Sequence, residues 1–267
     1  MLPPELDRDG YIVGIHNYCD RWCERCRFTE QCRVYEPRPV DANGMPRPID
    51  SDEFMDEVMH NFDKAVRMLH QMAKEHGLEW DAEESVEAVR EYQRQQLKRE
   101  EAISESRASK LTKDYMGLLD TWMDDNQPFF VEKCDQLQQH IQLNPEDGSP
   151  FQLAVKVRDA LEVLRWYHFQ ILAKLHRALS GRVDELEEPD PVQTDANGSA
   201  KVAMIGLERS LGALESMRNL FPEKTDDWIP LMAHLQRTIR AVEAEFPKVH
   251  EFLRPGFDVE AVAPKDE

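Results

Sequence analysis

Glycine is scarce in this chain, and the loops that bind phosphate groups are missing with it. The sequence has 11 glycines in 267 residues, and they form neither a Gly-x-Gly-x-x-Gly pattern nor a Walker A loop. The Gly-x-Ser-x-Gly, His-Glu-x-x-His and EF-hand patterns are also absent. These absences argue against the enzyme and calcium-binding classes that depend on those motifs, and the sequence specifies no catalytic nucleophile.

Long apolar runs and an excess of basic charge are missing too. No apolar stretch approaches the ~20 residues that cross a bilayer, and Met1–Gly10 lacks the basic start and apolar run of a secretory signal. With 33 Lys and Arg against 52 Asp and Glu, the formal net charge is −19. Such a surface repels phosphate backbones and anionic lipids. We therefore expect a cytoplasmic protein that binds neither nucleic acid nor membrane. A protein partner is expected, and its identity and the oligomeric state stay open.

Composition divides the chain into four parts. Residues 1–35 hold a cysteine cluster, and residues 36–50 contain four prolines and Asn43-Gly44, a composition typical of a linker. Residues 51–255 have helical apolar spacing, and residues 256–267 are expected to form a flexible tail. Apolar residues make up 41% of the chain and charged residues 32%, the balance of a globular protein.

The long third part predicts an all-α bundle of about six helices. The apolar stripe Phe54, Val58, Phe62, Ala65, Leu69 and Met72 marks the first helix, over 50–77. The polar region 91–110 is expected to project into solvent or to break the second helix. The fourth helix, over 149–180, is apolar on most faces, so we expect it at the centre of the bundle. The second, third, fifth and sixth helices are expected over 81–125, 128–143, 199–220 and 226–253.

The cysteine cluster is the most informative feature of the sequence. Four of the five cysteines lie within fourteen residues, spaced C-x3-C-x2-C-x5-C. In a reducing compartment, such spacing favours metal ligation over disulfides or merely buried thiols. The predicted ligands, in a small N-terminal metal-binding module, are Cys19, Cys23, Cys26 and Cys32.

Thiolates select zinc or iron–sulfur clusters. Zinc commonly takes its ligands from two separate C-x2-C pairs, and here the second pair is missing. If the stretch were helical, Cys19, Cys23 and Cys26 would spread over two turns, which suits a cluster better than one ion. Cys23-x2-Cys26-x5-Cys32 also resembles the cysteine staple of AddB-type iron–sulfur nucleases. The resemblance covers about ten residues and implies a cluster without implying a nuclease. We predict a [4Fe–4S] cluster, with Zn²⁺ as the alternative.

The neighbours of the cysteines leave several roles open. His16 is a possible substitute ligand for Cys19. Four arginines in the cluster would favour thiolates through their positive charge. The aromatic residues either shield a cluster from water or dock the module onto the bundle. They are Tyr18, Trp22, Phe28 and Tyr35.

Elsewhere the signals are weaker. Glu57-x-x-His60 matches half of a di-iron helical motif, but a second copy is missing. His168 falls on the apolar stripe of its helix, where it is either a hydrogen-bonded core histidine or part of a site with Glu162 or His176. Cys134 is expected to behave as a small apolar residue.

Three functions follow from these patterns. The favoured one is a four-cysteine metal protein in redox sensing, electron transfer or partner docking. The second is a non-enzymatic helical interaction protein in which zinc staples the N-terminal segment. The third is an enzyme with its site around His168.

Overall fold

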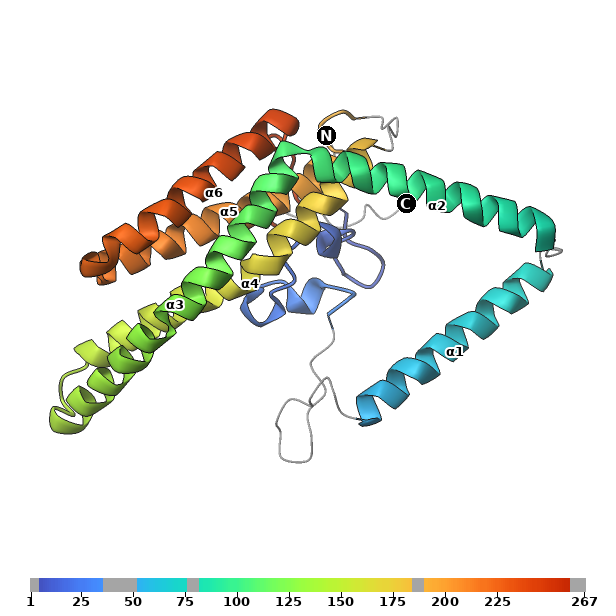
Figure 1. Cartoon of the computed structure of the whole chain (residues 1–267). Helices are drawn as coiled ribbons and strands as arrows, with labels where there is room; N and C mark the ends of the chain where they lie inside the picture. Colours follow the sequence, from blue (N-terminus) through green and yellow to red (C-terminus); the bar gives the residue numbers. More distant parts are fainter. Residues whose placement is uncertain (1–4, 36–51, 76–81, 184–189, 260–267) are drawn as a thin grey trace. The chain divides into compact units, whose positions relative to one another are not determined.

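A computed structural model of the chain describes residues 5–35, 52–75, 82–183 and 190–259 (Figure 1). These residues form six α-helices and no β-strand, apart from two isolated bridges, which confirms the prediction of an all-α multi-helix protein. None of the described helices is long and apolar enough to cross a membrane. The helices are α1 (Asp52–Glu75), α2 (Ala82–Glu105), α3 (Arg107–Leu143), α4 (Ser149–Val183), α5 (Asp195–Leu220) and α6 (Thr225–Glu245).

The chain divides into two compact units. One comprises residues 1–33 and 99–267, and therefore holds α3 to α6 together with the cysteines of the predicted site. The other comprises residues 34–98, with α1 and most of α2. The predicted linker at 36–50 lies outside the described residues, and the predicted domain limits stay predictions.

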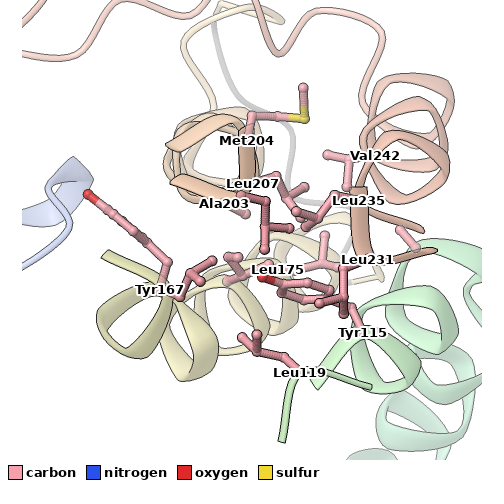
Figure 2. Close-up of a cluster of buried hydrophobic side chains, with 14 of the residues drawn as sticks. Tyr115, Leu119, Tyr167, Leu175, Ala203, Met204, Leu207, Leu231, Leu235 and Val242 are labelled. Atoms are coloured by element: carbon pink, nitrogen blue, oxygen red, sulfur yellow. The ribbon is translucent and has the colours of Figure 1, made fainter. Parts of the chain in front are cut away.

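The core of the first unit forms between α4, α5 and α6, with α3 beside α4 and α6 (Figure 2). α5 buries 13 of its 26 residues, whereas α4 buries 8 of its 35, so α5 rather than α4 is the more buried helix. The many small residues of α5 let neighbouring helices approach it closely, which explains its greater burial. A Cβ atom on Gly206 would lie 2.8 Å from Ile171 and 2.9 Å from Tyr167, so glycine permits the close approach of α4 and α5.

The boundary between α2 and α3 lies at Ser106, within the region 91–110 where a break was one of the two predicted outcomes. Pro128, where a new helix was expected to start, lies inside α3. Ser106 caps α3, because its Oγ accepts a hydrogen bond from the backbone N–H of Ser109 at 3.2 Å. Ser106 Oγ and the N–H of Ala108 also donate to the Glu245 carboxylate, at 2.9 and 3.0 Å. The carboxylate of α6 therefore fixes the point where the helix restarts.

Candidate metal centre

The cysteine segment, defined as residues 5–33, folds as a series of short turns instead of one helix. An antiparallel bridge pairs Leu6 with Ile12. The N–H of Ile12 donates to the Gln31 carbonyl at 3.0 Å, which brings the two ends of the segment together. The turns between them are the 3-10 helices η1 (Ile15–Tyr18), η2 (Cys23–Arg25) and η3 (Thr29–Gln31).

Each predicted ligand lies at an end of one of these turns. Cys19 follows η1, Cys23 begins η2, Cys26 follows η2 and Cys32 follows η3. All four thiols are free and half-buried. Burial raises the pKa of Cys23, and the charges of the other three thiols raise that pKa further. Cys23 is therefore within electrostatic reach of the other three thiols.

Backbone amides point at two of the sulfurs. Cys26 Sγ accepts a hydrogen bond from the N–H of Phe28 at 3.4 Å. Burial raises the pKa of the Cys19 thiol, and a hydrogen bond from the N–H of Arg21 opposes this rise. Arg21 is held at φ 59°, in the left-handed region. Amide donors of this kind stabilise thiolate charge and tune sulfur-bound metal centres.

The sulfurs do not form a finished ligand cage. Within the described part of the chain, no three His, Cys, Asp or Glu side chains converge closely enough to hold a metal ion. Binding by the four cysteines therefore requires their side chains to rotate and the turns to shift. Short metal-binding segments commonly rearrange in this way, because the ligands rarely take up their final positions before the metal binds.

His16 has a ring nitrogen that nothing else uses. Its Nδ1 is buried and has no hydrogen-bond partner among the described residues. Burial lowers the pKa of His16, and the charge of Arg21 lowers it further, so the imidazole is neutral near pH 7, the form that binds metals. The main-chain carbonyl of His16 lies 3.5 Å from Cys19 Sγ. The role of His16 as a substitute ligand stays a prediction.

Asp20, the residue after Cys19, anchors the cysteine segment to the bundle. Tyr167 Oη donates to Asp20 Oδ2, and Arg209 Nη1 donates to the same oxygen at 2.9 Å. Trp166 Nε1 donates to the main-chain carbonyl of Asp20 at 3.1 Å. In Figure 2 the Tyr167 side chain leaves the core of the bundle and points toward this segment. Burial raises the pKa of Tyr167, and the Asp20 carboxylate raises it further, so the phenol remains a donor.

Three of the four aromatic residues near the cysteines dock the segment onto the rest of its unit. Their rings contact partners from α4 and from the residues that follow α6, with centroid distances of 4.8 to 5.1 Å. Tyr35 is exposed and lies outside this unit. The three ring pairs are Tyr18 with Phe252, Trp22 with Trp166, and Phe28 with Phe257.

Two of the four arginines near the cysteines form ion pairs with carboxylates. Arg25 serves the same docking role, because it pairs with Asp159 at 2.6 Å and with Glu162 at 2.7 Å, both on α4. Arg33 pairs with two aspartates of the cysteine segment itself. Arg21 is the arginine whose charge lowers the Cys19 pKa, and burial outweighs it. Half of the positive charge predicted to favour thiolates is therefore paired with carboxylates.

Sequence reasoning missed the residues of the bundle that contact the cysteine segment. Tyr167 and Arg209 carried no signal, because nothing in their local sequence indicates Asp20 as a partner. Lys174 on α4 is half-buried, and its Nζ donates to the Asn17 carbonyl at 3.4 Å. Burial lowers the pKa of Lys174, and the nearby Cys19 charge opposes this. The one available signal in the sequence was the position of Lys174 on a helix predicted to be apolar on most faces.

A groove of about 500 Å³ lies between α4 and α5 and adjoins this docking surface. Asp159 and Arg209 line it, and both also hold the cysteine segment through Arg25 and Asp20. Lys156, at the end of the groove where α4 begins, adds a second cation. The groove therefore shares two of its lining side chains with the contacts that hold the cysteine segment.

The histidine site predicted on α4 is not assembled with its predicted neighbours. His168 is half-buried, and its Nε2 lies 3.0 Å from Asp120 Oδ1 on α3. Glu162 pairs with Arg25, and His176 pairs with Glu100 at 3.0 Å. Neither of the two contacts proposed for His168 is formed, and a catalytic role for His168 stays a prediction.

The remaining candidates, Glu57, His60 and Cys134, form no metal-holding group among the described side chains. His60 is exposed on α1, and the side chain of Glu57 lies outside the described ones. Cys134 is exposed on α3, and its expected behaviour as a small apolar residue stays a prediction.

No known protein family, characterised protein or solved structure matches the chain.

Proposed function

We propose that Cys19, Cys23, Cys26 and Cys32 bind one metal centre, a [4Fe–4S] cluster, and that the protein acts in redox sensing, electron transfer or docking of a protein partner in the cytoplasm. The observation that supports this most is the placement of all four thiols at the ends of three consecutive 3-10 turns in one short, closed segment. The amide donors to two of the sulfurs also support it. Closely spaced cysteines in one short run are also a common way in which proteins hold iron–sulfur clusters.

Zinc is the second candidate, and one observation favours it. The segment does not form a continuous helix, so the cysteines are not spread along one helix face. The argument from helical spacing against a single tetrahedral ion therefore no longer applies. In this case zinc stabilises the fold of the cysteine segment, and the function lies in the protein partner that the bundle binds.

The deciding experiment is metal and acid-labile sulfide analysis, with an absorption spectrum, on protein purified without oxygen. A cluster gives about four irons and four sulfides per chain, with a broad band near ~400 nm that dithionite bleaches. One zinc without sulfide supports the second candidate. Protein that binds neither metal after reconstitution contradicts both.

Ligand variants separate this site from the fifth thiol. We expect Cys23→Ser and Cys26→Ser to lose the metal and to disorder the cysteine segment, while the bundle keeps its helical circular dichroism. The matched control is Cys134→Ser, because Cys134 is exposed on α3 and should leave the metal content unchanged. Loss of most helical signal in the Cys23 or Cys26 variants would contradict the expected independence of the bundle.

A further inference from the structure

α1 carries large apolar side chains that the described structure leaves open to solvent. Phe62 and Leu69 have exposed fractions of 64% and 65%. Met59, Met68 and Met72 have exposed fractions of 58%, 56% and 53%. Exposed apolar surface gathered in this way on one helix is characteristic of an interaction site.

The spacing of these residues indicates what kind of partner covers them. Apolar positions alternate at three and four residues, an average period of 3.5, which is the pattern of a helix that packs along a second helix. In α2, by contrast, the exposed apolar residues Val89, Tyr92 and Leu97 do not keep this spacing. We call the row of apolar residues with this spacing in α1 the seam. Along the sequence it comprises Met55, Val58, Phe62, Ala65, Leu69 and Met72.

The charges of α1 favour a second copy of the same helix, in the opposite direction. Residues 52–63 contain five acidic residues and no Lys or Arg, whereas residues 64–75 contain three basic residues and one acidic residue. Two antiparallel copies place the acidic half of each helix beside the basic half of the other. A parallel pair would place like charges together, which costs specificity and stability.

We propose that α1 forms an antiparallel two-stranded coiled coil with α1 of a second copy, so that the protein is a homodimer. The seam supplies the buried contacts, and Met59 and Met68 widen them. Methionine adapts its shape easily and suits a surface of this kind. The proposal does not depend on the metal centre.

The oligomeric state is measured on the full-length protein by light scattering coupled to size exclusion, over a series of concentrations. We expect a mass of about 62 kDa, twice the 31.1 kDa of the chain. Phe62→Gln combined with Leu69→Gln should give the single-chain mass and raise the dimer dissociation constant at least about 100-fold. Glutamine keeps helix propensity and net charge, so the variant removes only the apolar contacts.

The matched control is His60→Gln combined with Gln71→Ala. These two residues are exposed and lie on the side of α1 opposite the seam, and neither is among the acidic and basic residues counted above, so the dimer should persist. The thermal unfolding transition of the bundle should not move in either double variant, which shows that the first unit is intact.

The direction of the helices is tested by cross-linking with a short bismaleimide, with the parent protein as background. With the two-fold axis near the middle of the seam, two copies of residue 65 lie close together. Two copies of residue 72 lie about 25 Å apart along the helix axis, at 1.5 Å per residue. Ala65→Cys should cross-link efficiently, and Met72→Cys should not.

Three results would overturn the proposal. A single-chain mass at every concentration excludes the dimer, and a dimer that survives the Phe62 and Leu69 changes excludes the seam. Equal cross-linking at positions 65 and 72 excludes the antiparallel direction.

Discussion

α5 and the cysteine segment belong to the same unit but are held in it by different forces. α5 buries half of its residues, among them Leu207 and Leu214 with no exposed surface. In the cysteine segment the buried apolar residues are Ile12 and Ile15, and the rest of its attachment consists of ring contacts, ion pairs and hydrogen bonds. The bundle therefore gains its stability from apolar burial. The segment depends on a small number of directional contacts, each of modest energy.

The largest effect should come from the core. Leu207→Ala removes a fully buried side chain and should lower the free energy of unfolding by about 2–5 kcal/mol. Denaturant unfolding followed by circular dichroism measures this change. The control is Ile229→Ala on α6, whose side chain is 49% exposed, and its effect should stay below about 1 kcal/mol. Equal losses in the two variants would show that α5 is not the centre of the core.

A smaller effect is expected where α5 meets the cysteine segment. A Cβ atom on Gly198 would lie 2.4 Å from the Tyr18 ring and 2.6 Å from Phe252. Gly198→Ala should push Tyr18 away and cost about 1–3 kcal/mol, together with faster proteolysis of the segment. Gly212→Ala is the matched control in the same helix, because nothing lies within 4 Å of its Cβ position. It should be neutral, or stabilise the helix by up to about 1 kcal/mol, without any change in proteolysis.

The smallest effect is expected for changes at Asp20, which anchors the cysteine segment to the bundle through hydrogen bonds. Asp20→Ala removes the acceptor shared by Tyr167 and Arg209 and should weaken the attachment of the segment by about 1–2 kcal/mol. Hydrogen exchange of residues 5–33 should increase, while the main unfolding transition of the bundle moves little. Asp20→Asn, which keeps an acceptor, should lie between the parent and the alanine variant. Unchanged exchange in Asp20→Ala would mean that the ring contacts alone hold the segment.

The helices could be predicted from the sequence because the signal is local. An apolar period of 3.5 or 3.6 residues runs along most of the helices. The start of α5 was predicted at residue 199, whereas the helix begins at Asp195 after the cap Thr194, whose side chain accepts the N–H of Asn197. A break within 91–110 was one of two predicted outcomes, but its position at Ser106 could not be predicted, since Glu245, which stabilises it, lies 139 residues away in the chain. Pro128, by contrast, is a local signal for a helix boundary, yet α3 continues through it in the folded protein.

The difference between local sequence signals and contacts between distant residues also applies to the candidate site. The four cysteines form a local pattern, so the sequence names the predicted ligands directly. The docking partners of Asp20 lie 147 and 189 residues further along the chain, and no pattern within 20 residues of the cysteines indicates them. The sequence also did not show that the segment forms 3-10 turns, which depend on the contacts at Gly198 and on the bridge between Leu6 and Ile12.

The contacts of Tyr18 with Phe252 and of Phe28 with Phe257 join the beginning of the chain to its last described residues. Phe252 and Phe257 lie far beyond the cysteines in the chain, so during synthesis the cysteine segment lacks both ring partners until these two residues have been made. A chain truncated before residue 252 would carry all four cysteines without the two aromatic rings that seat them.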